Sequence, residues 1–157
     1  MHSDETAPES FAVRTAAAAD RDAIRRLLQH LHPQDAGRAT LPLIRQESKT
    51  FVASDERGVI GLAAVTVVDY GVEAYGMIEE LVVEDSRRGE GVGSSLLESC
   101  RSWLEDAGAR VIFVSALDDA EQFYVGAGFS RCSGPWLYRS PGDQPDDVQG
   151  SPVGWVG

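Results

Sequence analysis

One segment constrains the fold of this chain more than any other: residues 88–94, which read Arg-Gly-Glu-Gly-Val-Gly-Ser. They follow an apolar run at residues 77–83. They precede apolar positions that recur at helical spacing, namely Leu96, Leu97, Cys100, Trp103 and Leu104. Glycine lets a backbone come close to a ligand, and a helix N-terminus presents unpaired amides and the positive end of a dipole. The segment therefore predicts a strand, a phosphate-binding turn and a helix in succession.

Spacing tests two phosphate-binding designs. A nucleoside-triphosphate loop needs a lysine and then serine or threonine after its last glycine, but Gly93 is followed by Ser94 and Ser95. A dinucleotide fingerprint needs glycines spaced G-x-G-x-x-G directly after the strand. Here the spacing is G-x-G-x-G, and residues 84–88 intervene. The first design is excluded and the second fits poorly.

Periodicity and turn signals predict the elements around this segment. The first part of the chain should hold a strand at residues 11–14 and a helix that Asp20 caps and Pro33 ends. Strands follow at residues 50–54, 59–68, 77–83 and 111–116, with a helix between Gly91 and Gly108 before the last of them. A short helix capped by Asp118 or Asp119 and a strand at 136–139 complete the order. The order β-α-β-β-β-α-β-α-β predicts a mixed α/β fold with helices on a central sheet.

Length and composition predict one folded domain. The chain has 157 residues, of which 43% are hydrophobic, enough for a single core. We expect a disordered tail at residues 1–10, a domain at 11–139 and a flexible or docking tail at 140–157. No apolar run is long enough to span a membrane, and the acidic N-terminus does not resemble a signal peptide, so we expect a cytoplasmic protein without membrane contact. Cys100 and Cys132 lack metal-ligand spacing, so no metal site is expected.

The charge balance bears on partners. Fourteen basic and 25 acidic residues give a formal net charge of -11, which repels phosphodiester backbones and argues against nucleic acid as a partner. The same field attracts a cationic amine, although solubility or salt adaptation explains the charge equally well. A homodimer is a further possibility, because apolar residues near the C-terminus could dock on a second copy of the chain. These residues are Val153, Trp155 and Val156.

Two blocks of this sequence resemble the GCN5-related N-acetyltransferase (GNAT) superfamily. The first is Arg-x-x-Gly-x-Gly at Arg88, Gly91 and Gly93, and the second is A-x-x-F-Y-x-x-x-G-F at residues 120–129. The resemblance implies a GNAT-like mixed central sheet with a splayed strand pair and helices on both faces. It also implies that the loop grips the pyrophosphate of acetyl-CoA. The implied coenzyme-binding residues are Leu81, Val82, Val83, Arg88, Gly89, Glu90, Gly91, Val92, Gly93 and Ser94.

The resemblance further implies an acetyl-CoA-dependent N-acetyltransferase. The acceptor would be a primary amine, in a small molecule rather than a protein, attacking the thioester directly in a ternary complex. Such a site needs a proton donor for the departing thiolate, and the residue that corresponds to the family's general acid is Tyr124. It also needs an acceptor for the amine proton, for which we favour Glu79 on the strand that positions the thioester. Consecutive strand residues point to opposite faces, so Glu80 should face away unless a bulge intervenes, and water alone is an alternative base.

Three positions depart from the family pattern. Glu90 stands where relatives frequently carry a cation beside the phosphates, Leu117 stands in place of a frequent asparagine, and Ile112 in place of a glutamate on the following strand. Glu90→Lys is expected to lower the Michaelis constant for acetyl-CoA. Glu90 and the open choice of base keep a second hypothesis open, namely a non-catalytic acyl-CoA-binding module that regulates a partner.

Overall fold

The computed structural model describes residues 11–134, 136 and 137, and the chain divides into two compact units. The first unit holds residues up to Ile44 together with Tyr70–Val72, and the second holds Arg45–Asp69 and the chain from Glu73 onward. The tails predicted at 1–10 and 140–157 lie outside the described residues. Among the described helices, none combines the length and the apolar character that crossing a membrane requires.

The first unit is helical. It contains η1 (Ala18–Asp20), α1 (Arg21–Leu28) and η2 (Ala36–Arg38). The Arg25 guanidinium donates to the Ala39 carbonyl at 3.1 Å, and the Thr40 amide donates to the Tyr70 carbonyl at 2.7 Å. These bonds hold α1 against η2 and join the separate segment at residues 70–72 to the rest of the unit.

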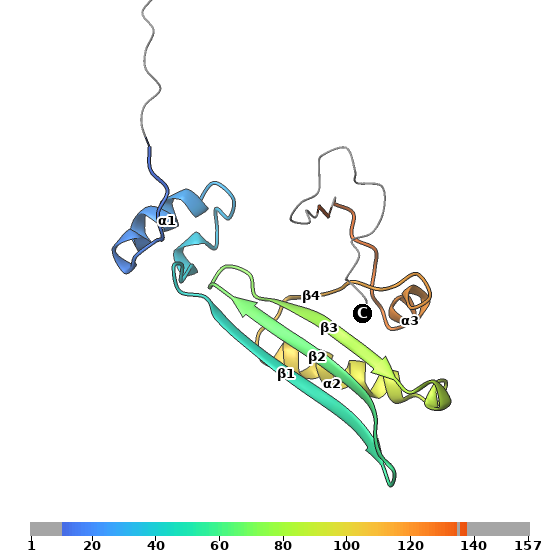
Figure 1. Ribbon diagram of the computed structural model, residues 1–157. Coiled ribbons are helices and arrows are strands. Elements are labelled where there is room, and N and C mark those ends of the chain that lie inside the picture. The colour runs from blue at the N-terminus through green and yellow to red at the C-terminus, as the bar shows by residue number, and fades with distance from the viewer. Residues whose placement is uncertain (1–10, 135, 138–157) are drawn as a thin grey trace, which may run out of the picture. The chain divides into compact units, whose positions relative to one another are not determined.

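The second unit is built on a four-stranded mixed sheet (Figure 1). Its strands are β1 (Arg45–Asp55), β2 (Gly58–Asp69), β3 (Tyr75–Val83) and β4 (Val111–Val114), in that spatial order. β1, β2 and β3 pair antiparallel, whereas β4 runs parallel to β3. A parallel neighbour requires a crossover connection, and α2 (Val92–Asp106) supplies it.

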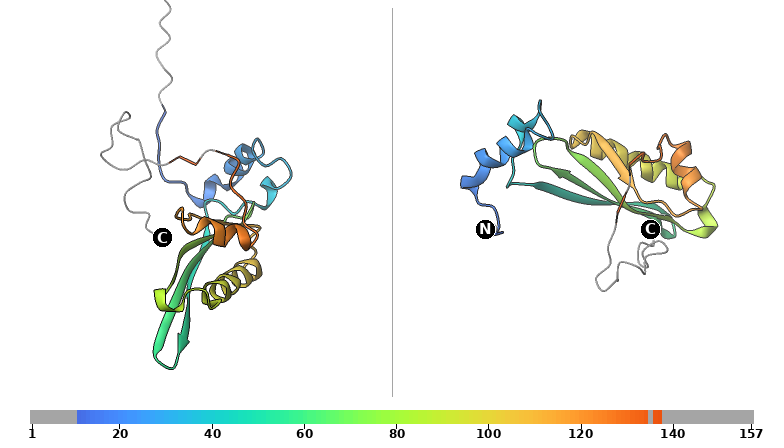
Figure 2. Two further views of the ribbon diagram at one scale, coloured as in Figure 1. Left: turned by 90° about the vertical axis from the view of Figure 1, so that its right-hand side faces the viewer. Right: turned by 90° about the horizontal axis from the view of Figure 1, so that it is seen from above.

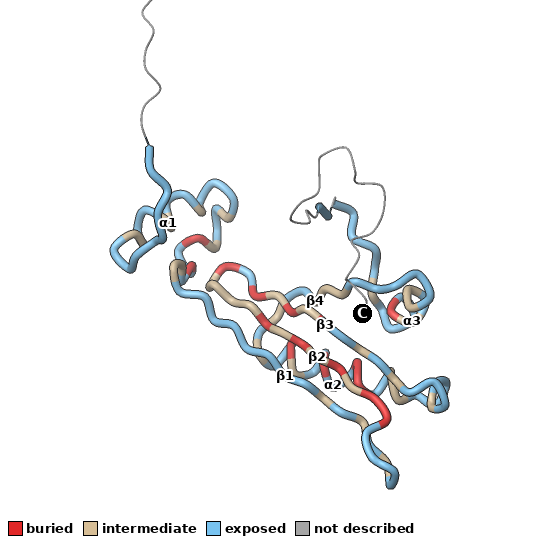
Figure 3. The backbone as a smooth tube through the Cα atoms, in the orientation of Figure 1, coloured by how far each residue is buried: buried red, intermediate tan, exposed pale blue. Residues whose placement is uncertain are grey.

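The core lies between the sheet and α2, which runs along one face (Figure 2). Alternate residues of β2 and one stripe of α2 form it: Ala63, Val65, Val67, Leu96, Cys100 and Leu104. The buried positions accordingly follow β2 and α2 (Figure 3). Gly76 lets α2 lie close to β3, because a Cβ atom on this residue would stand 2.7 Å from the Leu104 side chain.

The short helix α3 (Glu121–Gly126) packs on the same face of the sheet as α2. Tyr124 of α3, Leu97 of α2 and Ile78 of β3 form a second buried cluster. Ile78 pairs with Val65, whose side chain belongs to the α2 core, so all three lie on one face. The predicted mixed α/β fold is confirmed.

Several predicted boundaries are wrong. Residues 11–14 form no strand, and the Arg14 guanidinium instead pairs with the Asp20 carboxylate at 2.8 Å. β1 begins at Arg45, before the predicted residue 50, because pairing with β2 accommodates a polar segment that lacks apolar alternation. α3 begins after Ala120 with no side-chain cap, so neither Asp118 nor Asp119 caps it. Of the strand predicted at 136–139, Trp136 and Leu137 have no regular structure and the remainder lies outside the described residues.

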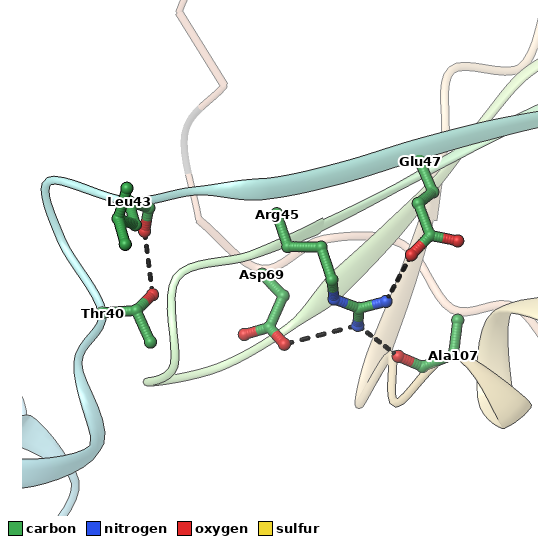
Figure 4. A network of polar contacts seen from close by, with 6 residues as sticks. All are labelled: Thr40, Leu43, Arg45, Glu47, Asp69 and Ala107. Atoms are coloured by element: carbon green, nitrogen blue, oxygen red, sulfur yellow. Dashed lines mark hydrogen bonds and ion pairs between the residues drawn. The ribbon is translucent and has the colours of Figure 1, made fainter.

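A single arginine joins β1 to the end of α2. The Arg45 guanidinium donates to the Ala107 carbonyl at 2.7 Å and pairs with the carboxylates of Glu47 and Asp69 (Figure 4). The last carbonyls of a helix have no partner within it, so Arg45 satisfies one of them and lies at the negative end of the helix dipole. The contact fixes the C-terminal end of α2 on the sheet.

Candidate active site

Pairing between strands β3 and β4 stops partway along β3. The two strands pair only from Tyr75 with Val111 to Ile78 with Val114, where β4 ends, and β3 continues to Val83. Residues 79–83 therefore have a strand neighbour on the β2 side alone among the described elements. This is the splayed pair that the sequence predicts.

Backbone direction along this part of β3 follows from one bond. The Glu84 amide donates to the Ile60 carbonyl at 2.9 Å, so Glu84 faces β2. Because backbone groups alternate along an antiparallel strand, the amides and carbonyls of Leu81 and Val83 point away from β2. They point to the side on which β4 has ended, where they are available to a ligand.

A β-bulge in β3 changes the position of the acidic pair. Ala64 pairs with Glu80 and Val65 with Ile78, which leaves Glu79 without a partner on β2. Ile78 and Leu81 both pack toward α2 although they are three residues apart, so the bulge absorbs one residue. Both Glu79 and Glu80 are exposed and lie between these two inward-facing residues. Without a bulge, Glu79 and Glu80 would point to opposite faces of the sheet. The bulge removes that alternation.

Tyr124 and the acidic pair line one small cavity at the splay, with a volume of about 30 Å³. Ile78, Glu79, Glu80 and Leu81 line it from β3, Tyr124 from α3, and residues 114–117 from the end of β4 onward. The structure thus brings together the two residues proposed as acid and base. Leu117 also lines this cavity.

Tyr124 is held firmly but its hydroxyl is unengaged. The residue is 7% exposed, and its ring packs edge-to-face on Phe123 and Phe129 at centroid distances of 5.0 and 5.6 Å. Among the described residues the hydroxyl has no hydrogen-bond partner. Burial raises the pKa of Tyr124 above its ordinary value, with smaller contributions from nearby Cys100 and Glu80. The phenol therefore keeps its proton at neutral pH, as a proton donor must.

The glycine segment forms the N-terminus of α2. Gly91 is the N-cap with φ +84°, Gly89 has φ +80°, and Ala or larger residues rarely adopt this left-handed conformation. The first bond of the helix runs from the Ser95 amide to the Gly91 carbonyl at 3.0 Å, and no side chain caps the helix. The amides of Val92, Gly93 and Ser94 consequently have no partner within the helix, as an anion-binding turn requires.

The turn lies beside the other site elements. A Cβ atom on Gly93 would stand 3.5 Å from the Phe123 ring and 3.7 Å from Val83. The predicted coenzyme-binding residues of β3 and of the turn thus adjoin α3, which carries Tyr124. Unpaired amides on both segments and open backbone at Gly89 and Gly91 suit a diphosphate joined to an extended arm.

Arginine pairing around the turn differs from the sequence-based expectation. Arg87, which the sequence analysis did not single out, pairs with the Asp55 carboxylate and, at 2.8 Å, with the Glu90 carboxylate. Glu90 therefore has a cationic partner within the protein, which it shares with Asp55. Arg88, the predicted ligand, is 65% exposed and pairs with Asp85 at 3.0 Å. Arg87 could have been suspected from its place beside Arg88, but its partner Asp55 is distant in the sequence.

Position 112 carries no acid. Ile112 packs between the sheet and α2. Both carboxylates that line the cavity, those of Glu79 and Glu80, come from β3.

Comparison with known proteins identifies the family to which this architecture belongs. The family model of the acetyltransferase (GNAT) domain matches residues 46–131, more than half of the chain. An uncharacterized N-acetyltransferase of Bacillus subtilis, YobR, is 29% identical over 89 residues, which cover 54% of this chain and 34% of that protein. The chain thus spans about a third of the length of this curated relative.

Solved structures share the fold at lower identity. Glucosamine-6-phosphate N-acetyltransferase from Arabidopsis thaliana is 18% identical, with a TM-score of 0.54 over 80% of this chain and 82% of that one. Ribosomal-protein-alanine N-acetyltransferase from Brucella melitensis is 13% identical, with a TM-score of 0.52 over 59% and 71%. With its splayed strands, its glycine turn and the match of the family model, the chain belongs to the GNAT acetyltransferase family.

Proposed function

We propose that this protein transfers an acetyl group from acetyl-CoA to the primary amine of a small molecule. The observation that carries the proposal is the shared cavity, where Tyr124, Glu79 and the open backbone of Leu81 meet. Acetyl-CoA would supply the thioester. The relatives named above act on different acceptors, a sugar phosphate and a ribosomal protein, so family membership alone does not identify the amine.

The proposed coenzyme-binding residues fall into two groups. Amides of Val92, Gly93 and Ser94 would bind the diphosphate at the positive end of α2, with Gly89, Glu90, Gly91 and Arg88 shaping the turn. Backbone groups of Leu81 and Val83 would hold the extended arm and position the thioester carbonyl, with Val82 between them. Donors that are fixed before reaction stabilise developing negative charge without reorganisation.

The proposed proton transfers use side chains of the cavity. An amine of pKa near 10 is protonated in neutral water and must lose a proton before its lone pair can attack. Glu79 would accept that proton, directly or through water, while Tyr124 holds the proton that the departing sulfur takes. Direct attack by the amine requires no covalent enzyme intermediate. The buried thiol of Cys100, whose pKa is raised to about 11, would be a poor nucleophile.

A first test combines an amine panel with one variant. Coenzyme A release from acetyl-CoA should depend on added primary amine, and Tyr124→Phe should lower kcat by about 10²- to 10⁴-fold with little change in the KM for acetyl-CoA. Tyr70→Phe, which removes the hydroxyl of a tyrosine that does not line the cavity, is the matched control. Near-normal turnover by Tyr124→Phe would exclude the role of Tyr124. Tight acetyl-CoA binding without turnover on any amine would instead support a non-catalytic acyl-CoA-binding module.

A further inference from the structure

The face of the sheet opposite α2 carries three aromatic rings in contact. Gly76 and Ile78 of β3 face α2, so the alternate residues Tyr75 and Met77 point to the other face, and Phe113, which pairs with Met77, does the same. The rings of Tyr75 and Phe113 lie 6.0 Å apart, and those of Phe113 and Trp136 lie 5.2 Å apart, both edge-to-face. We call Tyr75, Phe113 and Trp136 the aromatic wall.

The aromatic wall is accessible within its unit. Trp136 is 63% exposed, and Tyr75 and Phe113 are half-buried. Core packing does not explain these rings, because neither buried cluster includes them and both clusters lie on the α2 face. Exposed tryptophan in contact with other rings offers a flat apolar surface with π faces, which suits a ring or a cation.

The wall adjoins the acidic pair. Phe113 pairs with Met77, which precedes Glu79 by two residues, a separation of about 7 Å along a strand. Glu80 pairs with Ala64, which alternates with the core residues Ala63 and Val65, so Glu80 belongs to the same face as the wall. The face therefore presents aromatic rings and then, at the splay, two carboxylates.

On this juxtaposition, and on the acetyl transfer proposed above, we infer that the acceptor is an arylalkylamine, a primary ammonium separated by a short chain from an aromatic ring. The carboxylates attract the ammonium and orient it toward the cavity, while the wall stacks on the ring. A polyamine would satisfy the carboxylates but leave the wall without a ligand. A sugar amine would contact the wall only through a C–H face of its ring, so the flat apolar ring of an arylalkylamine matches the wall better in chemistry and shape.

The substrate test compares amines of equal charge. Specificity constants are measured for 2-phenylethylamine, 2-cyclohexylethylamine, butylamine and spermidine with saturating acetyl-CoA. We expect the aryl compound to exceed its saturated analogue by about 3- to 10-fold, the worth of an aromatic contact beyond area. Equal constants for the ring pair, or a clear preference for spermidine, overturn the inference while leaving acetyl transfer intact.

Variants locate the effect. Trp136→Leu and Phe113→Leu should each abolish the preference for the aryl over the cyclohexyl compound, leaving butylamine turnover and the KM for acetyl-CoA unchanged. Trp103→Leu is the matched control, since Trp103 lies on α2 at the other face, beneath the Lys49 ammonium at 5.1 Å. A preference that survives both wall variants overturns the inference.

Calorimetry separates failure of this inference from failure of the proposed function. If no amine is acetylated, 2-phenylethylamine is titrated into the full-length protein and into Trp136→Leu. Binding that the variant loses supports the wall as an amine site and shows that acetyl transfer was the wrong step. Absence of binding to the unaltered protein overturns both proposals.

Discussion

At the scale of single residues, Glu79 and Glu80 occupy one bulge but should act differently. Glu79→Gln should lower kcat by about 100-fold or more, as expected for loss of a general base. Glu80→Gln should mainly raise the KM for the amine. It should also move the alkaline limb of the kcat profile to lower pH, because the Glu80 charge contributes to raising the pKa of Tyr124 and activity is lost as that phenol ionises.

The measurement is a pair of pH profiles of kcat and of kcat/KM. A large loss of kcat in Glu80→Gln together with near-normal turnover in Glu79→Gln would show that Glu80, rather than Glu79, is the general base. Glu84→Gln, which alters a neighbouring carboxylate that does not line the cavity, controls for the change in net charge.

The two thiols should react at very different rates. Burial raises the pKa of Cys100 to about 11, whereas Cys132 is exposed. A disulfide reagent at pH 8 should therefore modify one thiol rapidly in the folded protein and two in denaturant, and Cys132→Ser should remove the fast phase. A fast phase of two thiols would mean that Cys100 is accessible. Because the buried thiol favours its proton in the folded state, its stabilising contribution is lost as the pH rises from about 9 to 11.

At the scale of elements, the turn before α2 can be tested through its charge. Glu90→Lys removes one of the two carboxylate partners of Arg87 and adds a cation at the positive end of α2. The KM for acetyl-CoA should fall about two- to fivefold, the usual contribution of one exposed ion pair, here between the lysine and the diphosphate. Glu98→Lys makes the same change on the exposed side of α2, where Glu98 pairs with Arg101 at 2.6 Å. Equal effects of both variants would indicate net charge rather than the turn.

Element by element, the sequence predicted what local patterns encode. Alternation located β2 and β3, and glycine signals located the two ends of α2 within about two residues. It missed what depends on partners distant in the chain. The polar start of β1 becomes a strand because β2 pairs with it, and the bulge at Glu79 exists only relative to β2. The ion pair of Arg87 with Asp55 is likewise invisible to local spacing.

At the scale of the whole molecule, the net charge of -11 should act oppositely on the two substrates. A cationic amine is attracted and an anionic coenzyme repelled, and both effects weaken as salt shortens the screening length. Raising the salt concentration from about 20 to 500 mM should therefore raise the KM for the amine and lower that for acetyl-CoA. Movement of both constants in the same direction would point to a change in the protein rather than to screening of its field.

The guanidinium of Arg87 connects the hairpin between β1 and β2 to the turn that begins α2, since it pairs with Asp55 on one side and Glu90 on the other. A substitution at the hairpin tip, some 35 positions upstream of the glycines, would therefore loosen the turn without touching it. Substitutions at the tip and in the turn are expected to be non-additive, because both alter the environment of the same guanidinium. A library that tunes coenzyme selectivity would therefore gain from randomising the tip and the turn together.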